Sequence, residues 1–164
     1  MGMPFSADEV LEMAEQIERN GSTFYRKAAE KYPALRTLLL ELAAMEDKHE
    51  QTFARMRTEL SGREVEAPVF DPDDEAQMYL RVMANGHVFN LRADPAEKLA
   101  EIETAEDLLK MAMRVERDSI AFYVGLKESV SQKAGKDRVE GIIREEMKHV
   151  AILNERLDAL KQAR

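Results

Sequence analysis

Two copies of the pattern Glu-x-x-His are the residues of this sequence best suited to chemistry. Glu46 and His49 form the first copy, and Glu146 and His149 form the second. Residues three positions apart lie on one face of an α-helix, so each copy directs a carboxylate and an imidazole to the same side. A single copy is a weak signal, because Glu and His are common on exposed helices. Two copies 100 positions apart indicate a pair of related half-sites.

A second pair of glutamates lies at equivalent positions of an internal repeat. A shift of 98 positions aligns residues 6–30 with residues 104–128, with nine identities among 25 pairs, and it pairs Glu18 with Glu116. Internal repeats of this kind point to paired structural units. Glu15, one helical turn before Glu18, is an alternative candidate, but its counterpart is Met113. The repeat therefore favours Glu18 and Glu116.

Four carboxylates at one level of a helical core need a counter-charge. Buried carboxylates repel one another and lose hydration, so some must take up protons unless a cation is present. Two divalent ions would offset four carboxylates, and two imidazoles would complete the ligand shell. Such a ligand set without thiolate favours iron or manganese and tolerates zinc. We therefore predict two metal ions per chain, with iron as the first choice. The predicted ligands are Glu18, Glu46, His49, Glu116, Glu146 and His149.

Two tyrosines and a third histidine are further candidates. Tyr25 and Tyr123 follow Glu18 and Glu116 by seven residues, on nearly the same helix face two turns further on. They could donate hydrogen bonds to ligand carboxylates and so tune the metal ions. The alternative, a structural role as aromatic core residues, stays open. His87 has no counterpart in the repeat, and the sequence assigns it no role.

The hydrophobic pattern predicts four long helices that position these residues. Apolar or small residues recur at intervals of three and four, and the polar candidates interrupt these stripes near their middles. A capping box at residues 6–9, Pro33 and Thr104 mark helix starts. The predicted helices span Ala7–Lys31, Pro33–Leu60, Ala105–Val130 and Lys136–Ala163. Short connections make residues 6–60 and 104–163 two antiparallel hairpins.

Residues 61–103 form a long connection between the hairpins. Its prolines and aspartates set it apart from the helices, and it predicts short helices at Asp73–Asn85 and Pro95–Ile102. A connection of this length can cross the whole bundle, although a plain surface linker is the alternative. The prediction is an all-α four-helix bundle that forms a single domain over residues 1–164.

The ligand pattern resembles that of a known family. One Glu from each of two helices, plus Glu-x-x-His from each of the other two, is the arrangement of ferritin-like dimetal-carboxylate proteins. In this sequence it looks like the rubrerythrin-like branch of the ferritin-like diiron-carboxylate proteins. The resemblance implies that Glu46 and Glu146 bridge two metal ions, that Glu18 and Glu116 are terminal ligands, and that each histidine binds one ion.

The sequence departs from rubrerythrins proper in two respects. It has no cysteine, so no rubredoxin domain is present in it. Rubrerythrins also carry an additional carboxylate one turn from the ligand of the third helix, where this sequence has Met113. By resemblance we expect a redox enzyme that reacts with peroxide or dioxygen and needs a separate electron donor. The alternatives are a ferroxidase-type iron storage or delivery protein, a dimanganese catalase-like enzyme, and a metal-free helical interaction module.

Composition excludes several other functions. The formal net charge is −8, which disfavours nucleic acids and anionic membranes as partners. The absence of cysteine excludes disulfides, thiolate zinc sites and iron–sulfur clusters. The first residues predict no signal peptide, and no apolar run is long enough to span a membrane. We expect a cytoplasmic protein, and a homodimer is a plausible assembly for such a bundle.

Overall fold

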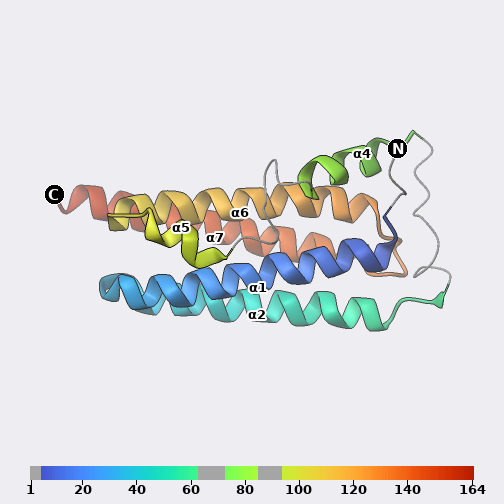
Figure 1. Cartoon of the computed structure of the whole chain (residues 1–164), viewed down its shortest axis with the longest axis horizontal. Helices are drawn as coiled ribbons and strands as arrows, with labels where there is room; N and C mark the ends of the chain where they lie inside the picture. Colours follow the sequence, from blue (N-terminus) through green and yellow to red (C-terminus); the bar gives the residue numbers. More distant parts are fainter. Residues whose placement is uncertain (1–4, 63–72, 85–93) are drawn as a thin grey trace.

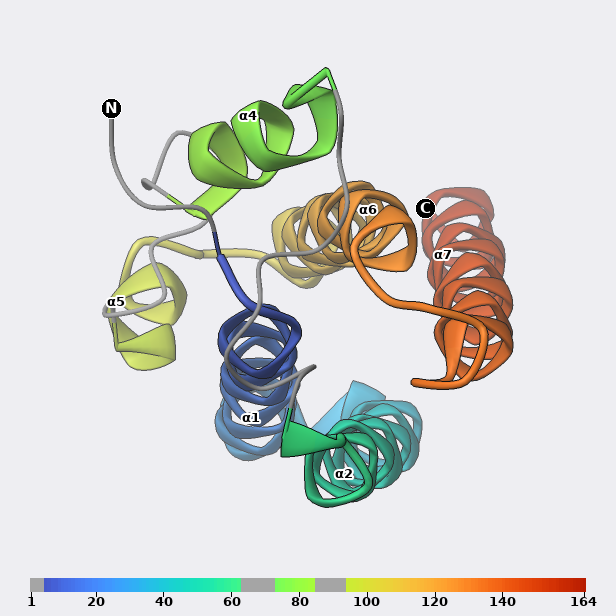
Figure 2. The same cartoon turned by 90° about the vertical axis from the view of Figure 1, so that its right-hand side faces the viewer.

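Four long helices form the body of the molecule. The computed structural model describes residues 5–62, 73–84 and 94–164. Helix α1 packs along α2, and α6 packs along α7 (Figure 1). The end-on view shows the four helices at the corners of a bundle (Figure 2). Their bounds are Ala7–Lys31 for α1, Arg36–Thr58 for α2, Ala105–Glu128 for α6 and Lys136–Gln162 for α7. The predicted all-α bundle is confirmed.

The first hairpin turns through a short 3₁₀ segment, η1 (Pro33–Leu35). The capping box that opens α1 is present, because Ser6 accepts from the backbone of Glu9 and the Glu9 side chain accepts from the backbone of Ser6. The single helix predicted over roughly Pro33–Leu60 is instead the segment η1 followed by α2, which ends at Thr58, two residues before the predicted end. Proline has no backbone N–H and fixes its own φ, so the chain makes a tight turn at Pro33 before α2 begins.

The second hairpin follows its predicted bounds closely. The Thr104 side chain accepts a hydrogen bond from the backbone of Asp107 at the start of α6. Helix α6 ends at Glu128, two residues before the predicted Val130, and α7 ends at Gln162, one residue before the predicted Ala163. Gly135 precedes α7 with a φ of 110°, a left-handed conformation that favours glycine.

In the described parts of the connection between the hairpins, residues 75–82 and 95–100 form the short helices α4 and α5. Helix α4 (Glu75–Val82) packs along α6, and α5 (Pro95–Ala100) packs along α1 (Figure 2). Both are shorter than predicted, and Asn85 and His87 lie outside the described residues. A Cβ at Gly125 of α6 would lie 2.6 Å from a ring carbon of Tyr79, so glycine lets α4 approach closely.

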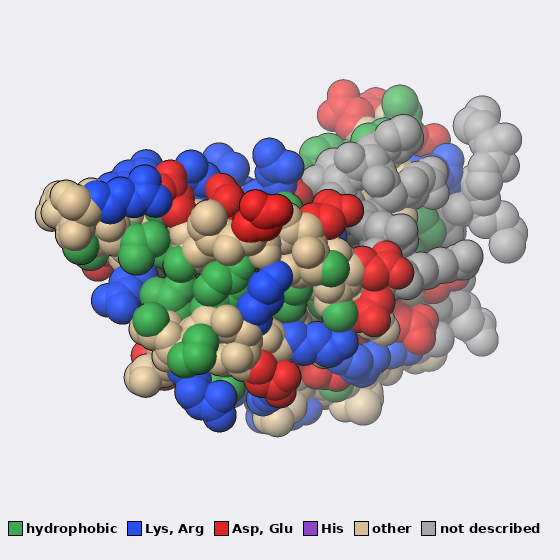
Figure 3. Space-filling model, turned by 60° about the vertical axis from the view of Figure 1, so that its left-hand side comes forward, with side chains coloured by type: hydrophobic (Ala, Val, Ile, Leu, Met, Phe, Trp, Pro, Cys, Tyr) green, Lys and Arg blue, Asp and Glu red, His purple; other side chains and the backbone are tan. Residues whose placement is uncertain are grey.

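The core consists of two apolar clusters with a polar layer between them. One cluster includes Phe53, Met56 and Phe122, and the other includes Leu39, Leu109 and Leu153. On the face drawn in Figure 3, apolar side chains gather between charged ones, and no histidine of the described residues is visible. None of the described helices is long and apolar enough to cross a lipid bilayer.

Candidate metal centre

The polar layer in the middle of the bundle contains all six of the residues that the sequence predicts as ligands. Helices α1 and α6 each contribute one glutamate, and α2 and α7 each contribute one glutamate and one histidine. Every one of these residues is at most 3% exposed. The six residues are Glu18, Glu46, His49, Glu116, Glu146 and His149. The repeat thus brings two half-sites face to face across the core.

The cluster divides into two overlapping sets of potential ligand atoms. Each set offers atoms that all lie within 4.8 Å of one another. Glu46 and Glu146 belong to both sets. His49 and Glu18 complete the first set, and His149 and Glu116 complete the second. Two such sets that share two carboxylates have the arrangement needed to hold a pair of ions side by side.

The histidines present their Nδ1 atoms to the carboxylates. Nδ1 of His49 lies 2.6 Å from Glu146 Oε1 and 3.4 Å from Glu18 Oε2. Nδ1 of His149 lies 3.3 Å from Glu146 Oε2 and 3.4 Å from Glu46 Oε1. The two rings are stacked, with 5.8 Å between their centroids. Although these nitrogen–oxygen distances are short, neither Nδ1 atom makes a hydrogen bond to a described residue.

Unsatisfied polar atoms provide a test of whether the cluster fits metal ions. Among the described residues, every buried side-chain nitrogen or oxygen without a hydrogen-bond partner belongs to these six residues. Buried polar groups are nearly always hydrogen-bonded, so such a concentration of unpaired donors and acceptors needs an explanation. Metal ions bound by oxygen and imidazole nitrogen would satisfy these atoms, and the residues therefore fit a metal centre.

Burial shifts the pKa values of the carboxyl groups. Desolvation, followed by repulsion from Glu146, raises the pKa of Glu18 to about 7. Desolvation and neighbouring carboxylates also raise the pKa values of Glu46 and Glu116 well above the ordinary value. Desolvation acts the same way on Glu146, but the close polar contacts with Glu116 and both histidines outweigh it and lower the pKa of Glu146.

The pKa values of the two histidines shift in the direction opposite to the one that burial alone would cause. Desolvation lowers the pKa of His49, but Glu146 and Glu18 outweigh it and raise the value to about 11. Desolvation likewise lowers the pKa of His149, and Glu116, Glu146 and Glu46 raise it to about 12. Without metal, the cluster therefore compensates its charge with protons at neutral pH. Metal ions must displace these protons in order to bind.

The two tyrosines cross from one repeat to the other. The Tyr25 hydroxyl of α1 donates to Glu116 of α6, and the Tyr123 hydroxyl of α6 donates to Glu18 of α1. Both rings are fully buried. Burial, followed by the nearby carboxylates, raises both tyrosine pKa values well above 10, so the phenols remain protonated donors. The tyrosines are thus both core residues and partners of the predicted ligands.

Two further glutamates near the cluster were, respectively, an alternative ligand candidate and a residue that the sequence analysis did not name. Glu15 forms an ion pair with Arg57 at 3.1 Å, away from the polar layer that contains Glu18. Glu145 was not predicted, but its carboxylate lies 2.6 Å from Nε2 of His49. Its position directly before Glu146 gave no sign of this contact, which depends on how α7 packs opposite α2.

The four-helix bundle and its buried Glu and His cluster define the class of ferritin-like carboxylate proteins. The family model described as Rubrerythrin matches residues 9–157, and the chain belongs to the rubrerythrin family. Its fold matches the crystal structure of a Thermotoga maritima protein described as a candidate ferritin-like diiron-carboxylate protein. The TM-score is 0.73 and the sequence identity is 25%, over 94% of this chain and 96% of that one. None of the curated proteins compared with the chain matches it significantly.

Proposed function

We propose that this protein is a diiron oxidoreductase that reacts with peroxide or dioxygen. Glu46 and Glu146 would be shared by the two ions, with Glu18 and Glu116 as the outer carboxylate ligands. The observation that carries the proposal is the pair of overlapping ligand sets, buried and otherwise unsatisfied. Oxygen and imidazole ligands without sulfur favour iron or manganese, and membership of the rubrerythrin family favours iron.

When bound, two ferrous ions would supply the two electrons that reduce a peroxide to water. The protein contributes the surroundings in which this can occur. Tyr25 and Tyr123 hold the outer carboxylates in place, because each donates to one oxygen of Glu116 or Glu18. Apolar clusters lie on both sides of the layer, and burial of the six residues limits their contact with bulk water. The sequence has no cysteine for a thiolate-ligated iron centre, and the proposal therefore includes a separate electron donor.

The experiment is a stopped-flow reaction of the anaerobically reconstituted ferrous protein with hydrogen peroxide and, separately, with dioxygen. Oxidation is followed by near-ultraviolet absorbance, and turnover is measured after a reductant is added. We expect oxidation by at least one oxidant to be complete within seconds and to be reversed by the reductant. The Glu46→Ala protein, which lacks a shared ligand, should show neither event.

Other outcomes would assign a different function. Uptake of many ferric ions per chain would favour iron storage or delivery. Two manganese ions, with peroxide disproportionation that needs no reductant, would favour a catalase-like enzyme. A protein that binds no metal, and whose thermal stability is unchanged or raised by Glu46→Ala or His49→Ala, would be a helical interaction module.

A further inference from the structure

The two half-sites differ at one pair of equivalent positions. The shift of 100 positions that pairs the two Glu-x-x-His motifs also pairs Met45 with Glu145. Glu145 reaches across from α7, and its carboxylate lies 2.6 Å from Nε2 of His49. At the equivalent place on α2, Met45 lines the same cavity as His149. Nε2 of His149 has no hydrogen-bond partner among the described residues.

This difference affects how firmly each imidazole is held. Both rings present Nδ1 to the carboxylates, so a metal-binding imidazole carries its proton on Nε2. At His49, the Glu145 carboxylate accepts that proton's hydrogen bond, which fixes the tautomer and the ring orientation. At the equivalent position beside His149, Met45 offers only a thioether, which is a weak acceptor. Nothing comparable therefore fixes the second ring.

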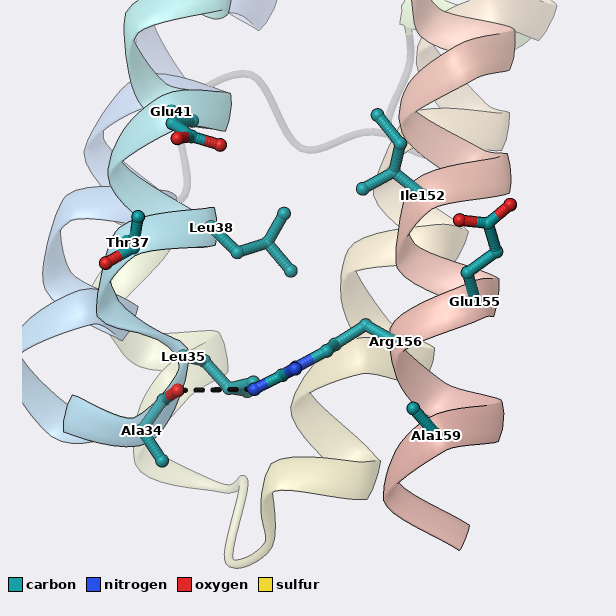
Figure 4. Close-up of a pocket in the computed structure, with 9 residues that line it drawn as sticks. All are labelled: Ala34, Leu35, Thr37, Leu38, Glu41, Ile152, Glu155, Arg156 and Ala159. Atoms are coloured by element: carbon teal, nitrogen blue, oxygen red, sulfur yellow. Dashed lines mark hydrogen bonds between the residues drawn. The ribbon is translucent and has the colours of Figure 1, made fainter. Parts of the chain in front are cut away.

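The weakly held histidine also lies beside an opening. Two adjoining cavities of about 460 and 580 Å³ lie between α2 and α7, and they share Leu38, Glu41 and Ile152 as lining residues. We call them together the α2–α7 groove. Figure 4 shows the larger cavity, where Arg156 donates across to the Ala34 backbone oxygen. The smaller cavity is the one that His149 lines.

We propose that the two metal positions are unequal. The position at His49 fills first and holds its ion more tightly, with Glu145 as a positioning residue. The position at His149 fills second and exchanges its ion with solution through the α2–α7 groove. This inference rests on the proposed dimetal function and adds an order of binding to it.

The test is a titration of the metal-free protein with Co²⁺ under nitrogen, followed by calorimetry and by the visible absorption of bound cobalt. We expect two binding events whose dissociation constants differ at least tenfold. Glu145→Met gives both half-sites the same neighbour and should weaken the tighter event by about 10–100-fold. Glu145→Gln keeps an acceptor oxygen and should retain part of the difference.

Met45→Glu is the matched variant, since it supplies the missing acceptor at His149. It should strengthen the weaker event and bring the two dissociation constants together. Glu145 has a side chain that is 44% exposed, so its replacement should leave the helical circular dichroism unchanged. Two equal events in the original protein, or an unchanged difference in Glu145→Met, would overturn the proposal and leave the dimetal function intact. Absence of any cobalt binding would instead contradict the dimetal function itself.

Discussion

Replacing Gly21 by alanine tests how closely the metal centre is packed against α1. A Cβ at Gly21 would lie 2.4 Å from Glu46 Oε2 and 3.3 Å from Glu46 Cδ. Ordinary contact begins at 3.4 Å, so the carboxylate would have to retreat by about 1 Å. The distance between a metal ion and its ligand atom varies by only about 0.2 Å around its usual value. Because Glu46 belongs to both ligand sets, the displacement should affect both ions.

We expect Gly21→Ala to lower the affinity for each ion at least tenfold, which is a loss of about 1.4 kcal/mol per ion. The metal-free protein should lose little stability, because the clash is with the end of a side chain and alanine gains up to about 1 kcal/mol over glycine in a helix. The assay is competition with a chelator for Co²⁺ or Fe²⁺, combined with thermal unfolding of the metal-free protein.

Gly141→Ala is the matched control. Gly141 lies in α7, and a Cβ there would have no neighbour within 4 Å. This variant should bind metal normally and unfold at a slightly higher temperature. If Gly21→Ala bound two ions as tightly as Gly141→Ala does, Glu46 would not be confined between α1 and the ions, and the reasoning would be refuted.

Three further predictions concern the tyrosines and the protons of the cluster. Tyr25→Phe and Tyr123→Phe keep the buried rings but remove the donor to Glu116 or Glu18, so each should weaken metal binding about 10–100-fold in chelator competition; unchanged affinity in both would argue for a purely structural role. The pKa of Glu18 is raised to about 7, so its contribution to the stability of the metal-free protein, about 3 kcal/mol, is present below pH 4.5 and is lost as pH rises towards 7. The raised pKa values of His49 and His149 also make the metal-free protein less stable as the pH rises above 6.5. Calorimetry should therefore show the metal-free protein melting at a lower temperature at pH 8 than at pH 5. The reverse order would contradict these pKa shifts. Metal binding at pH 7 should release several protons, which titration calorimetry in buffers of different ionisation enthalpy would detect; identical heats in all buffers would contradict the protonated cluster.

The helices and the cluster could be predicted because both depend on short-range periodicity. An apolar residue every three or four positions defines the buried stripe of a helix, and a glutamate within that stripe must face the core. The repeat then distinguishes Glu18, whose counterpart is Glu116, from Glu15, whose counterpart is Met113. The structure brings the six residues together because the two hairpins bury equivalent stripes against each other.

Contacts between the hairpins could not be predicted in the same way. Tyr25 donates to the glutamate of the other repeat rather than to Glu18 on its own helix, and this depends on how α1 faces α6. The contact of Glu145 with His49 and the clearance at Gly21 depend in turn on the spacing of neighbouring helices. Sequence periodicity determines which face of a helix is buried, but it does not determine which residue lies opposite.

Elemental analysis of the purified protein tests the central claim most directly, because the account depends on two metal ions per chain at the six buried residues. The protein would be measured as isolated and after anaerobic reconstitution with Fe²⁺, beside Glu46→Ala and Glu146→Ala. We expect two metal ions per chain in the original protein, with iron predominant, and a clear loss in both variants. No metal in the original protein after reconstitution, or an unchanged content in both variants, would contradict the account.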